Sequence, residues 1–175
     1  GTGNKIIGNL AENFTVSQDY KTIRLKIRSD VYFHADPCFG GSTKKMTVED
    51  VKFSLEFACS ANPLNKLGHL LKEKIVGAEA FYKLSAVSFP GIGVVGINII
   101  DEQTVEIKLT NSYTGFLNIL THPNLTIFSK RAYDYYGNNI IKHAVGTGSF
   151  CLGKTTKGGI SLLRNKDYWK KDGFG

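Results

Sequence analysis

The feature that most constrains the fold is the alternation of apolar and polar side chains in residues 22–28. Ile23, Leu25 and Ile27 take every second position, and the side chains between them are mostly charged. Successive side chains of a β-strand point to opposite faces of its sheet. The alternation therefore predicts a half-buried antiparallel strand, with Leu25 facing the core and Lys26 facing solvent.

A second strand is predicted directly before this one. Phe14 and Val16 continue the same period of two, and the polar residues 17–20 between the strands have the composition of a turn. Two alternating segments joined by a short turn indicate a β-hairpin.

A capped helix is predicted over residues 47–59. Thr47 precedes a first turn that carries Glu49 and Asp50, and both a hydroxyl and acidic side chains are favoured at the amino end of a helix. Pro63 prevents its continuation, because the residue before a proline avoids the helical conformation. The apolar side chains form two stripes, so we expect the helix to be covered on two sides. These side chains are Val48, Val51, Leu55 and Ala58 on one stripe, and Phe53 and Phe57 on the other.

The remaining segments predict further short elements, which give an α+β fold of antiparallel hairpins packed on helices. In chain order they are a helix at residues 76–82, a hairpin at 94–109 that turns at Asp101-Glu102, a helix at 114–121, a buried strand at 125–128, and a helix that Ser129 caps and Gly137 ends. A chain of 175 residues, 42% of them hydrophobic, can bury one real core but cannot form two full-sized domains.

The net charge of +7, from 22 Lys and Arg against 15 Asp and Glu, raises the question of a polyanionic partner. The basic residues are spread along the chain, as expected for a solvated surface. They include Arg24, Lys26 and Arg28, the pair Lys44 and Lys45, and the pair Lys170 and Lys171. A basic interaction module that binds nucleic acid is therefore the alternative function, and it would require a lysine-rich face on one side of the fold.

No set of residues indicates catalysis, so we do not expect an enzyme. The four histidines, His34, His69, His122 and His143, form no metalloprotease motif, and no nucleophile elbow is present. His34 next to Asp36 could form a metal pair, but a loop histidine that satisfies backbone groups is the favoured interpretation. Cys38, Cys59 and Cys151 lack zinc-site spacing, and buried thiols are expected for Cys59 and Cys151, with one disulfide as the alternative. No cofactor or metal is expected.

Two glycine-rich segments could contact phosphate through backbone amides. Residues 91–96 match the dinucleotide fingerprint, but the motif needs a helix after it and here the β-branched residues 97–100 follow. Residues 146–148 could cradle a phosphate. A strand that enters a sheet is the favoured interpretation of this second segment.

Several separated motifs resemble the extracytoplasmic solute-binding proteins of the peptide and nickel class, the receptors of ABC importers. They lie between about residue 8 and about residue 170, in the order typical of that family. The motifs are Leu10-Ala11-Glu12, Ser17-Gln18-Asp19-Tyr20, Phe33-His34, Thr47-Val48-Glu49-Asp50-Val51, Val145-Gly146-Thr147-Gly148-Ser149-Phe150 and Arg164-Asn165-Lys166-Asp167-Tyr168-Trp169. Tyr20 stands where the family usually has a turn glycine, and Ser149 stands where proline is usual.

The resemblance implies a partial lobe of a two-lobe periplasmic-binding-protein fold. Residues 1–142 would form the appended subdomain of the first lobe, and residues 143–175 its re-entry strand and turn. No leader and no long apolar segment is present, and the resemblance implies a fragment from which a secretion leader and the second lobe are missing.

The implied function is the substrate-binding component of an ABC transporter. Such a receptor captures peptides or similar solutes, works with the transporter's membrane subunits, and is a monomer in the periplasm or anchored to the outer side of a membrane. No nucleic-acid partner is expected. The ligand itself is left open among peptides, nickel chelates, oligosaccharides and haem.

Ligand-binding residues follow from the resemblance alone, in two segments. The loop after the first helix, residues 62–68, supplies Asn65 and Leu67, for which a structural role is favoured. The second segment comprises His122, Pro123 and Asn124. For His122, ligand contact and a helix-ending histidine that bonds a carbonyl group remain equal alternatives.

Overall fold

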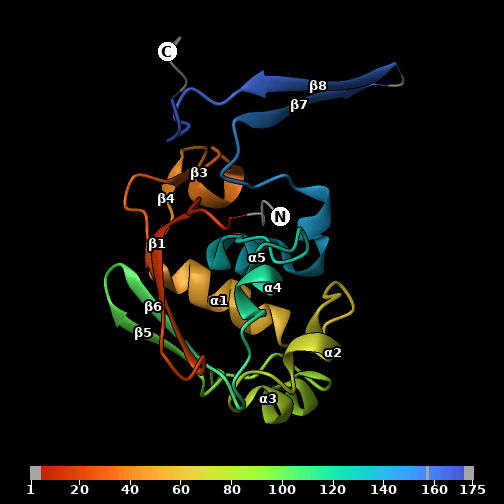
Figure 1. Cartoon of the computed structure of the whole chain (residues 1–175). Coiled ribbons are helices and arrows are strands. Elements are labelled where there is room, and N and C mark those ends of the chain that lie inside the picture. The colour runs from red at the N-terminus through yellow and green to blue at the C-terminus, as the bar shows by residue number, and fades with distance from the viewer. Residues whose placement is uncertain (1–4, 157, 172–175) are drawn as a thin grey trace. The chain divides into compact units, whose positions relative to one another are not determined.

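The computed structural model describes residues 5–156 and 158–171 and contains both helices and antiparallel strands (Figure 1). The chain divides into two compact units. The first comprises residues 1–28 and 47–127, and the second comprises residues 29–46 and 128–175. No helix in the described ranges is both long enough and apolar enough to span a membrane.

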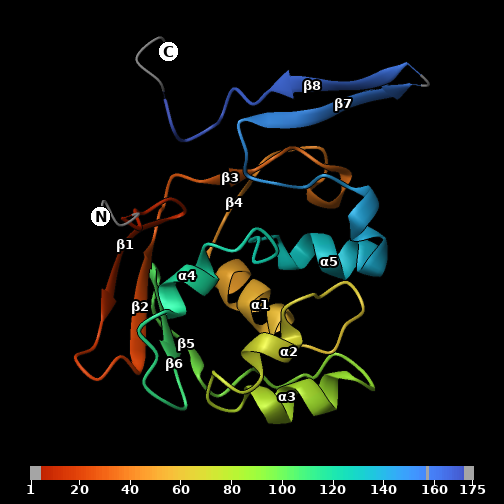
Figure 2. The ribbon, with the colours of Figure 1, turned by 45° about the vertical axis from the view of Figure 1, so that its right-hand side comes forward.

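A four-stranded antiparallel sheet with order β1-β2-β6-β5 organises the first unit (Figure 2). Its strands are β1 (Ala11–Val16), β2 (Thr22–Ile27), β5 (Ile97–Asp101) and β6 (Thr104–Lys108). The helices of the unit are α1 (Val48–Ala58), α2 (Gly68–Leu71), α3 (Ala78–Ser85) and α4 (Phe116–Leu120). The two predicted hairpins and the predicted capped helix are therefore confirmed.

One face of the sheet forms the core. Ile23 lies opposite Ile107, which in turn lies opposite Ile97, and all three side chains are almost inaccessible to solvent. Helix α1 packs against β5 and β6. The predicted register of β2 is correct, because Ile23 and Ile27 are buried while Lys26 is exposed. Leu25 faces the same side but is only half-buried.

The turn between β1 and β2 contains a non-glycine residue with left-handed backbone geometry. Tyr20 has a φ of 55°, which L-residues other than Asn and Asp rarely adopt. The turn is held by the Asp19 carboxylate, which accepts hydrogen bonds from the Ser17 hydroxyl and from the Lys21 amide. Local hydrogen bonds therefore keep Tyr20 in a conformation that glycine adopts at lower cost.

Helix α1 begins at a capping box formed by Thr47 and Asp50. The Asp50 carboxylate accepts from the Thr47 amide at 3.0 Å and from the Thr47 hydroxyl at 3.2 Å. Phe53 and Phe57 are buried and pack against Phe89, which follows α3. The prediction that α1 is covered on two sides is thus correct.

The prediction of a buried strand at residues 125–128 is wrong. This segment is irregular, and its residues are half-buried or exposed. The backbone turns instead, with the Leu125 amide donating to the His122 carbonyl and the Thr126 hydroxyl donating to the Pro123 carbonyl. The first of these bonds uses the Leu125 amide, which a sheet ladder would need.

The second unit is built from short elements. They are β3 (Tyr32–Phe33), the 3-10 turn η1 (Pro37–Phe39), β4 (Lys44–Lys45), α5 (Lys130–Tyr136), the 3-10 segment η2 (Gly137–Lys142), β7 (Phe150–Thr156) and β8 (Gly159–Arg164). Strand β3 pairs with β4, and β7 pairs with β8. The predicted helix between Ser129 and Gly137 is confirmed as α5, although the Ser129 side chain makes no capping hydrogen bond. The strand expected at residues 145–150 begins only at Phe150.

A polar cluster connects η1 to α5 within the second unit. The Asp36 carboxylate accepts from the Cys38 amide at 2.9 Å and from the Tyr136 hydroxyl at 2.7 Å, and this second bond raises the pKa of Tyr136 to about 12. The Arg131 guanidinium donates to the Cys38 carbonyl at 2.8 Å. The ring of His143 stacks on Tyr136. These contacts hold the loop that precedes α1 against the helix that follows residue 129.

Candidate ligand-contact segments

Asn65 closes the chain reversal that follows α1. Its amide nitrogen Nδ2 donates to the carbonyl oxygens of Ala58 and Ser60, and its Oδ1 accepts from the Leu67 amide at 2.8 Å. The last carbonyl groups of a helix lack partners within the helix, so this side chain supplies one. Asn65 is thus engaged in the structure of the loop.

Leu67 is buried, with 5% of its surface exposed. It stands at the start of α2, where its carbonyl accepts from the amides of Leu70 and Leu71. A side chain in this position contributes to the core and offers little surface to a ligand. The structural role favoured for Asn65 and Leu67 agrees with these contacts.

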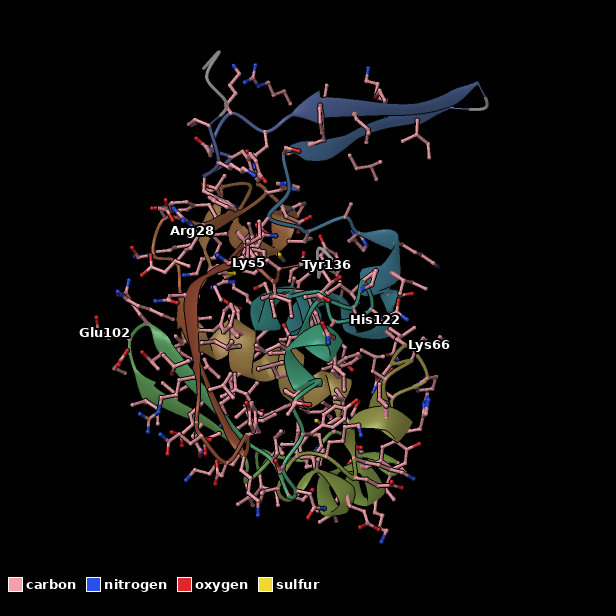
Figure 3. All side chains as sticks on the ribbon, viewed as in Figure 1. Lys5, Arg28, Lys66, Glu102, His122 and Tyr136 are labelled. Carbon is pink, nitrogen blue, oxygen red and sulfur yellow. The ribbon has the colours of Figure 1, made fainter. Side chains whose placement is uncertain are left out.

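The turn after α4 carries the second predicted segment, His122, Pro123 and Asn124, and all three residues are exposed. The His122 amide donates to the Ile119 carbonyl at 3.0 Å, which closes the end of the helix. The ring nitrogen Nδ1 accepts from the Asn124 amide at 3.1 Å. Figure 3 labels His122 among the side chains of the first unit.

This geometry determines the tautomer of a neutral His122 ring. A nitrogen that accepts a hydrogen bond carries no proton, so the proton resides on Nε2. The ring therefore presents an N–H donor on an exposed turn. The two predicted segments are each closed by their own hydrogen bonds. His122, Pro123 and Asn124 are exposed, whereas Asn65 is half-buried and Leu67 is buried.

His34 is buried and contacts backbone carbonyl groups through both ring nitrogens. Nε2 lies 2.9 Å from the Gly148 oxygen, and Nδ1 lies 3.4 Å from the Ala144 oxygen. Asp36, the other member of the hypothetical metal pair, accepts from Cys38 and Tyr136. Within residues 5–156 and 158–171, no group of three or more His, Cys, Asp or Glu residues could hold a metal ion.

The two glycine-rich segments direct their backbone groups to protein partners. The Val94 amide donates to the carboxylate of Glu56, whose pKa burial raises above its ordinary value against the opposing effect of Lys52. Strand β5, not a helix, follows residues 91–96. In residues 146–148 the Gly146 oxygen accepts from the His34 amide and the Gly148 oxygen accepts from Asn165.

The three cysteines are free thiols. Cys59 is buried as predicted, and burial raises its pKa to about 12. Burial also raises the pKa of Cys38 to about 12. Cys151 is only half-buried, so its predicted burial is wrong; it lies on β7, which among the described strands pairs with β8 alone.

A basic cavity in the second unit was not predicted. Its volume is about 770 Å³, and four cationic side chains line it together with aromatic and polar groups. The lining residues are Ser149, Phe150, Arg164, Asn165, Lys166, Tyr168, Lys170 and Lys171. The cluster of basic residues in the last part of the sequence was its only signal, and that signal does not distinguish a cavity from a solvated surface.

Comparison with known proteins identifies the family of this chain. Residues 5–173 match the model of the bacterial extracellular solute-binding proteins, family 5 Middle. The chain is 31% identical over 148 residues to the glutathione-binding protein GsiB of Salmonella typhi, and 32% identical over 149 residues to that of Escherichia coli O1:K1. Each alignment covers 85% of this chain but 24% of the relative, so the chain spans about a quarter of the relatives' length.

Solved structures show the same fold. The periplasmic binding protein DppA of Helicobacter pylori, in complex with the peptide STSA, matches with a TM-score of 0.70 and 24% identity over 95% of this chain and 32% of that chain. The substrate-binding domain of an oligopeptide ABC transporter of Bacillus anthracis matches with a TM-score of 0.73 and 23% identity over 93% and 30% of the two chains. The α+β fold of this chain is thus one part of a periplasmic-binding-protein fold. The chain belongs to the family 5 bacterial extracellular solute-binding proteins.

Proposed function

We propose that this chain is part of the substrate-binding component of an ABC importer that captures peptides or similar small solutes. The family match over residues 5–173 carries the proposal. Its relatives are a glutathione-binding protein and receptors solved with peptides, and glutathione is itself peptide-like. The proposed partners are a small solute and the membrane subunits of the transporter, and the longer receptor acts as a monomer outside the cytoplasm, in the periplasm or anchored to the membrane.

In a receptor of the relatives' length, residues 1–142 form the subdomain appended to the first lobe, and residues 143–175 begin the return to that lobe. The shares of 30% and 32% of the matched chains are consistent with part of one lobe. The two compact units divide the chain at other residues, because residues 29–46 pack with residues 128–175. The division at residue 142 refers to the lobes of the longer receptor, whereas the two compact units refer to this chain alone.

Within this part of the receptor, the turn formed by His122, Pro123 and Asn124 contributes one wall of the ligand site. Exposure of the turn and the donor on Nε2 of His122 support this assignment. A carbonyl or carboxylate oxygen of a peptide is the matching acceptor. Asn65 and Leu67 act indirectly, by fixing the loop between α1 and α2.

A binding role is favoured over catalysis and over nucleic-acid binding. The matched relatives bear the names of binding proteins. Several exposed lysines are paired with acidic side chains, as in the pairs Lys26–Glu12, Lys83–Glu79 and Lys130–Asp134. Such pairs neutralise part of the cationic surface that a polyanion would contact.

A chimaeric receptor tests the role of His122. Residues 5–173 replace the matching segment of the Salmonella glutathione-binding protein, and calorimetry measures the affinity for glutathione. His122→Ala should weaken binding about tenfold, the effect of one lost hydrogen bond to a charged or polar ligand.

His69→Ala is the matched control, because His69 is an exposed histidine of the same unit that lies outside the predicted segments. Equal affinities of the His122 and His69 variants would remove His122 from the ligand site. Thermal unfolding of each variant separates a lost contact from a lost fold.

A further inference from the structure

The buried ring of His34 holds the segment that leads into β7. This segment, residues 144–149, runs beside β3 (Figures 1 and 2). The His34 amide donates to the Gly146 carbonyl at 2.8 Å. In the ring, Nε2 lies 2.9 Å from the Gly148 oxygen and Nδ1 lies 3.4 Å from the Ala144 oxygen. One residue therefore contacts three carbonyl groups of the same short segment.

The same point fixes the other end of the β7–β8 hairpin. Asn165, which follows β8, donates through Nδ2 to the Gly148 oxygen at 2.9 Å, and its amide donates to the Ser149 oxygen at 2.8 Å. His34 is 7% exposed and Asn165 is 8% exposed. Both side chains are thus covered by residues of this chain, and no further part of a longer receptor is needed to bury them.

The number of protons on the His34 ring follows from its two acceptors. A carbonyl oxygen only accepts hydrogen bonds, so Nε2 must carry a proton to bond Gly148. In a neutral ring Nδ1 then presents a lone pair to the Ala144 oxygen, and no bond forms there. The doubly protonated ring donates to both carbonyl groups. The separation of 3.4 Å exceeds that of an ordinary N–H···O hydrogen bond, so this second contact is the one that a gained proton would shorten.

The partners of the His34 ring in the described residues are backbone groups, and no charged side chain there bonds to it. The Asp36 carboxylate, two residues along the chain, is engaged by the Cys38 amide and the Tyr136 hydroxyl. Burial disfavours a charged ring, whereas two carbonyl acceptors favour it. The other titratable side chains that flank these contacts are Tyr32, Cys38, His143, Arg164, Lys166 and Asp167.

We propose that His34 is a pH-sensitive clamp on the segment that leads into β7. The doubly protonated ring bonds the carbonyl groups of Ala144 and Gly148, and loss of the Nδ1 proton releases Ala144. Histidine side chains change charge between about pH 5 and about pH 8. The unfolded chain offers the ring no such fixed pair of acceptors, so the clamp stabilises the segment most at the acidic end of this range. That stabilisation is lost as the pH rises.

Hydrogen exchange of the backbone amide of residue 34 in the whole chain tests the clamp, because this amide bonds the Gly146 carbonyl inside the clamped segment. Its protection factor, which corrects for the intrinsic exchange rate at each pH, should be at least about threefold larger at about pH 5.5 than at about pH 7.5. His34→Gln keeps an amide donor but cannot gain a proton, so its protection factor should be the same at both pH values. His143→Gln is the matched control, a histidine of the same unit whose removal should leave the pH dependence in place.

Nitrogen NMR of the histidine rings in the unmodified chain keeps the proposal testable if His34→Gln is poorly folded. Both ring nitrogens of His34 should carry a proton at about pH 5.5, and Nε2 alone should carry one at about pH 8. A ring that is neutral at about pH 5.5, or a neutral ring with its proton on Nδ1, would overturn the proposal. So would a pH dependence of protection that survives in His34→Gln. No ligand enters these measurements, so their outcome is separate from that of the proposed function.

Discussion

Individual residues of this chain use side-chain hydrogen bonds to stabilise conformations that the backbone would otherwise avoid. The Asp19 carboxylate supports the turn that contains Tyr20, and the Asn65 amide supports the reversal after α1. Such roles are visible in a sequence only as turn-forming residue types. Which side chain bonds which backbone group depends on the final geometry.

Tyr20→Gly should stabilise the protein by about 1 kcal/mol, because left-handed geometry costs roughly that much for a residue with a Cβ atom. The Tyr20 side chain is 45% exposed, so little packing is lost. Urea unfolding of both proteins measures the change. A clear loss of stability would mean that the tyrosine ring makes contacts worth more than the backbone strain.

Glu106 should make stability depend on pH in the acidic range. A hydrogen bond from Arg24, together with the nearby charges of Arg24 and Lys108, lowers the pKa of Glu106 below its ordinary value. A carboxyl group with a lowered folded-state pKa stabilises the fold above its unfolded-state pKa, and that stabilisation is lost as the pH falls.

Glu106→Gln should therefore lower the free energy of unfolding at about pH 7 and have a smaller effect at about pH 3. Chemical denaturation at both pH values measures the difference. Glu102→Gln, at an exposed glutamate in the turn between β5 and β6, is the control. An equal effect of Glu106→Gln at both pH values would contradict the proposed ionic contribution.

At the scale of elements, the apolar period of β2 determines which side of the sheet faces the core. Ile23→Ala should destabilise by about 3 kcal/mol, a typical cost for removing a buried aliphatic side chain. Leu25→Ala should cost less, since Leu25 is half-buried, and Lys26→Ala should have almost no effect. The order of the three denaturation midpoints checks the register, and a larger loss from Lys26→Ala than from Ile23→Ala would reverse it.

The sequence predicts an element correctly where apolar side chains recur with a regular period. It fails where local hydrogen bonds determine the backbone conformation. Alternation predicted β2 and β6, and the capped stripe predicted α1. The apolar residues in 125–128 also predict a strand, but there the Leu125 amide donates to the His122 carbonyl and the backbone forms a turn. The half-buried position of Cys151 follows from the exposure of β7, which no local pattern indicates.

The candidate site was predictable only in part. Family resemblance identifies His122 and its neighbours, and only the structure shows that Nδ1 of His122 accepts from the Asn124 amide and that the turn is exposed. The basic cavity near Tyr168 had no distinctive signal, because a basic run at residues 164–171 is equally typical of a solvated surface. Only the structure places Ser149 and Phe150 beside that run. Spatial convergence of this kind depends on the fold.

At the scale of the whole molecule, the chain represents part of one lobe of a larger receptor fold. It covers 30–32% of the two matched structures described above and 24% of the glutathione-binding relatives. A two-lobe receptor buries its ligand between lobes, so most contacts with the ligand should come from outside these residues. We therefore propose that this chain contributes to a binding site without containing all of it.

Isothermal titration with glutathione and with the peptide Ser-Thr-Ser-Ala tests this claim most directly. The chimaeric receptor should bind one of these ligands with a dissociation constant on the order of micromolar, or about 8 kcal/mol of binding free energy. The chain of residues 1–175 alone should retain half of that or less, which corresponds to about millimolar affinity. Micromolar or tighter binding by the chain alone would contradict the account, because the whole site would then lie within these residues.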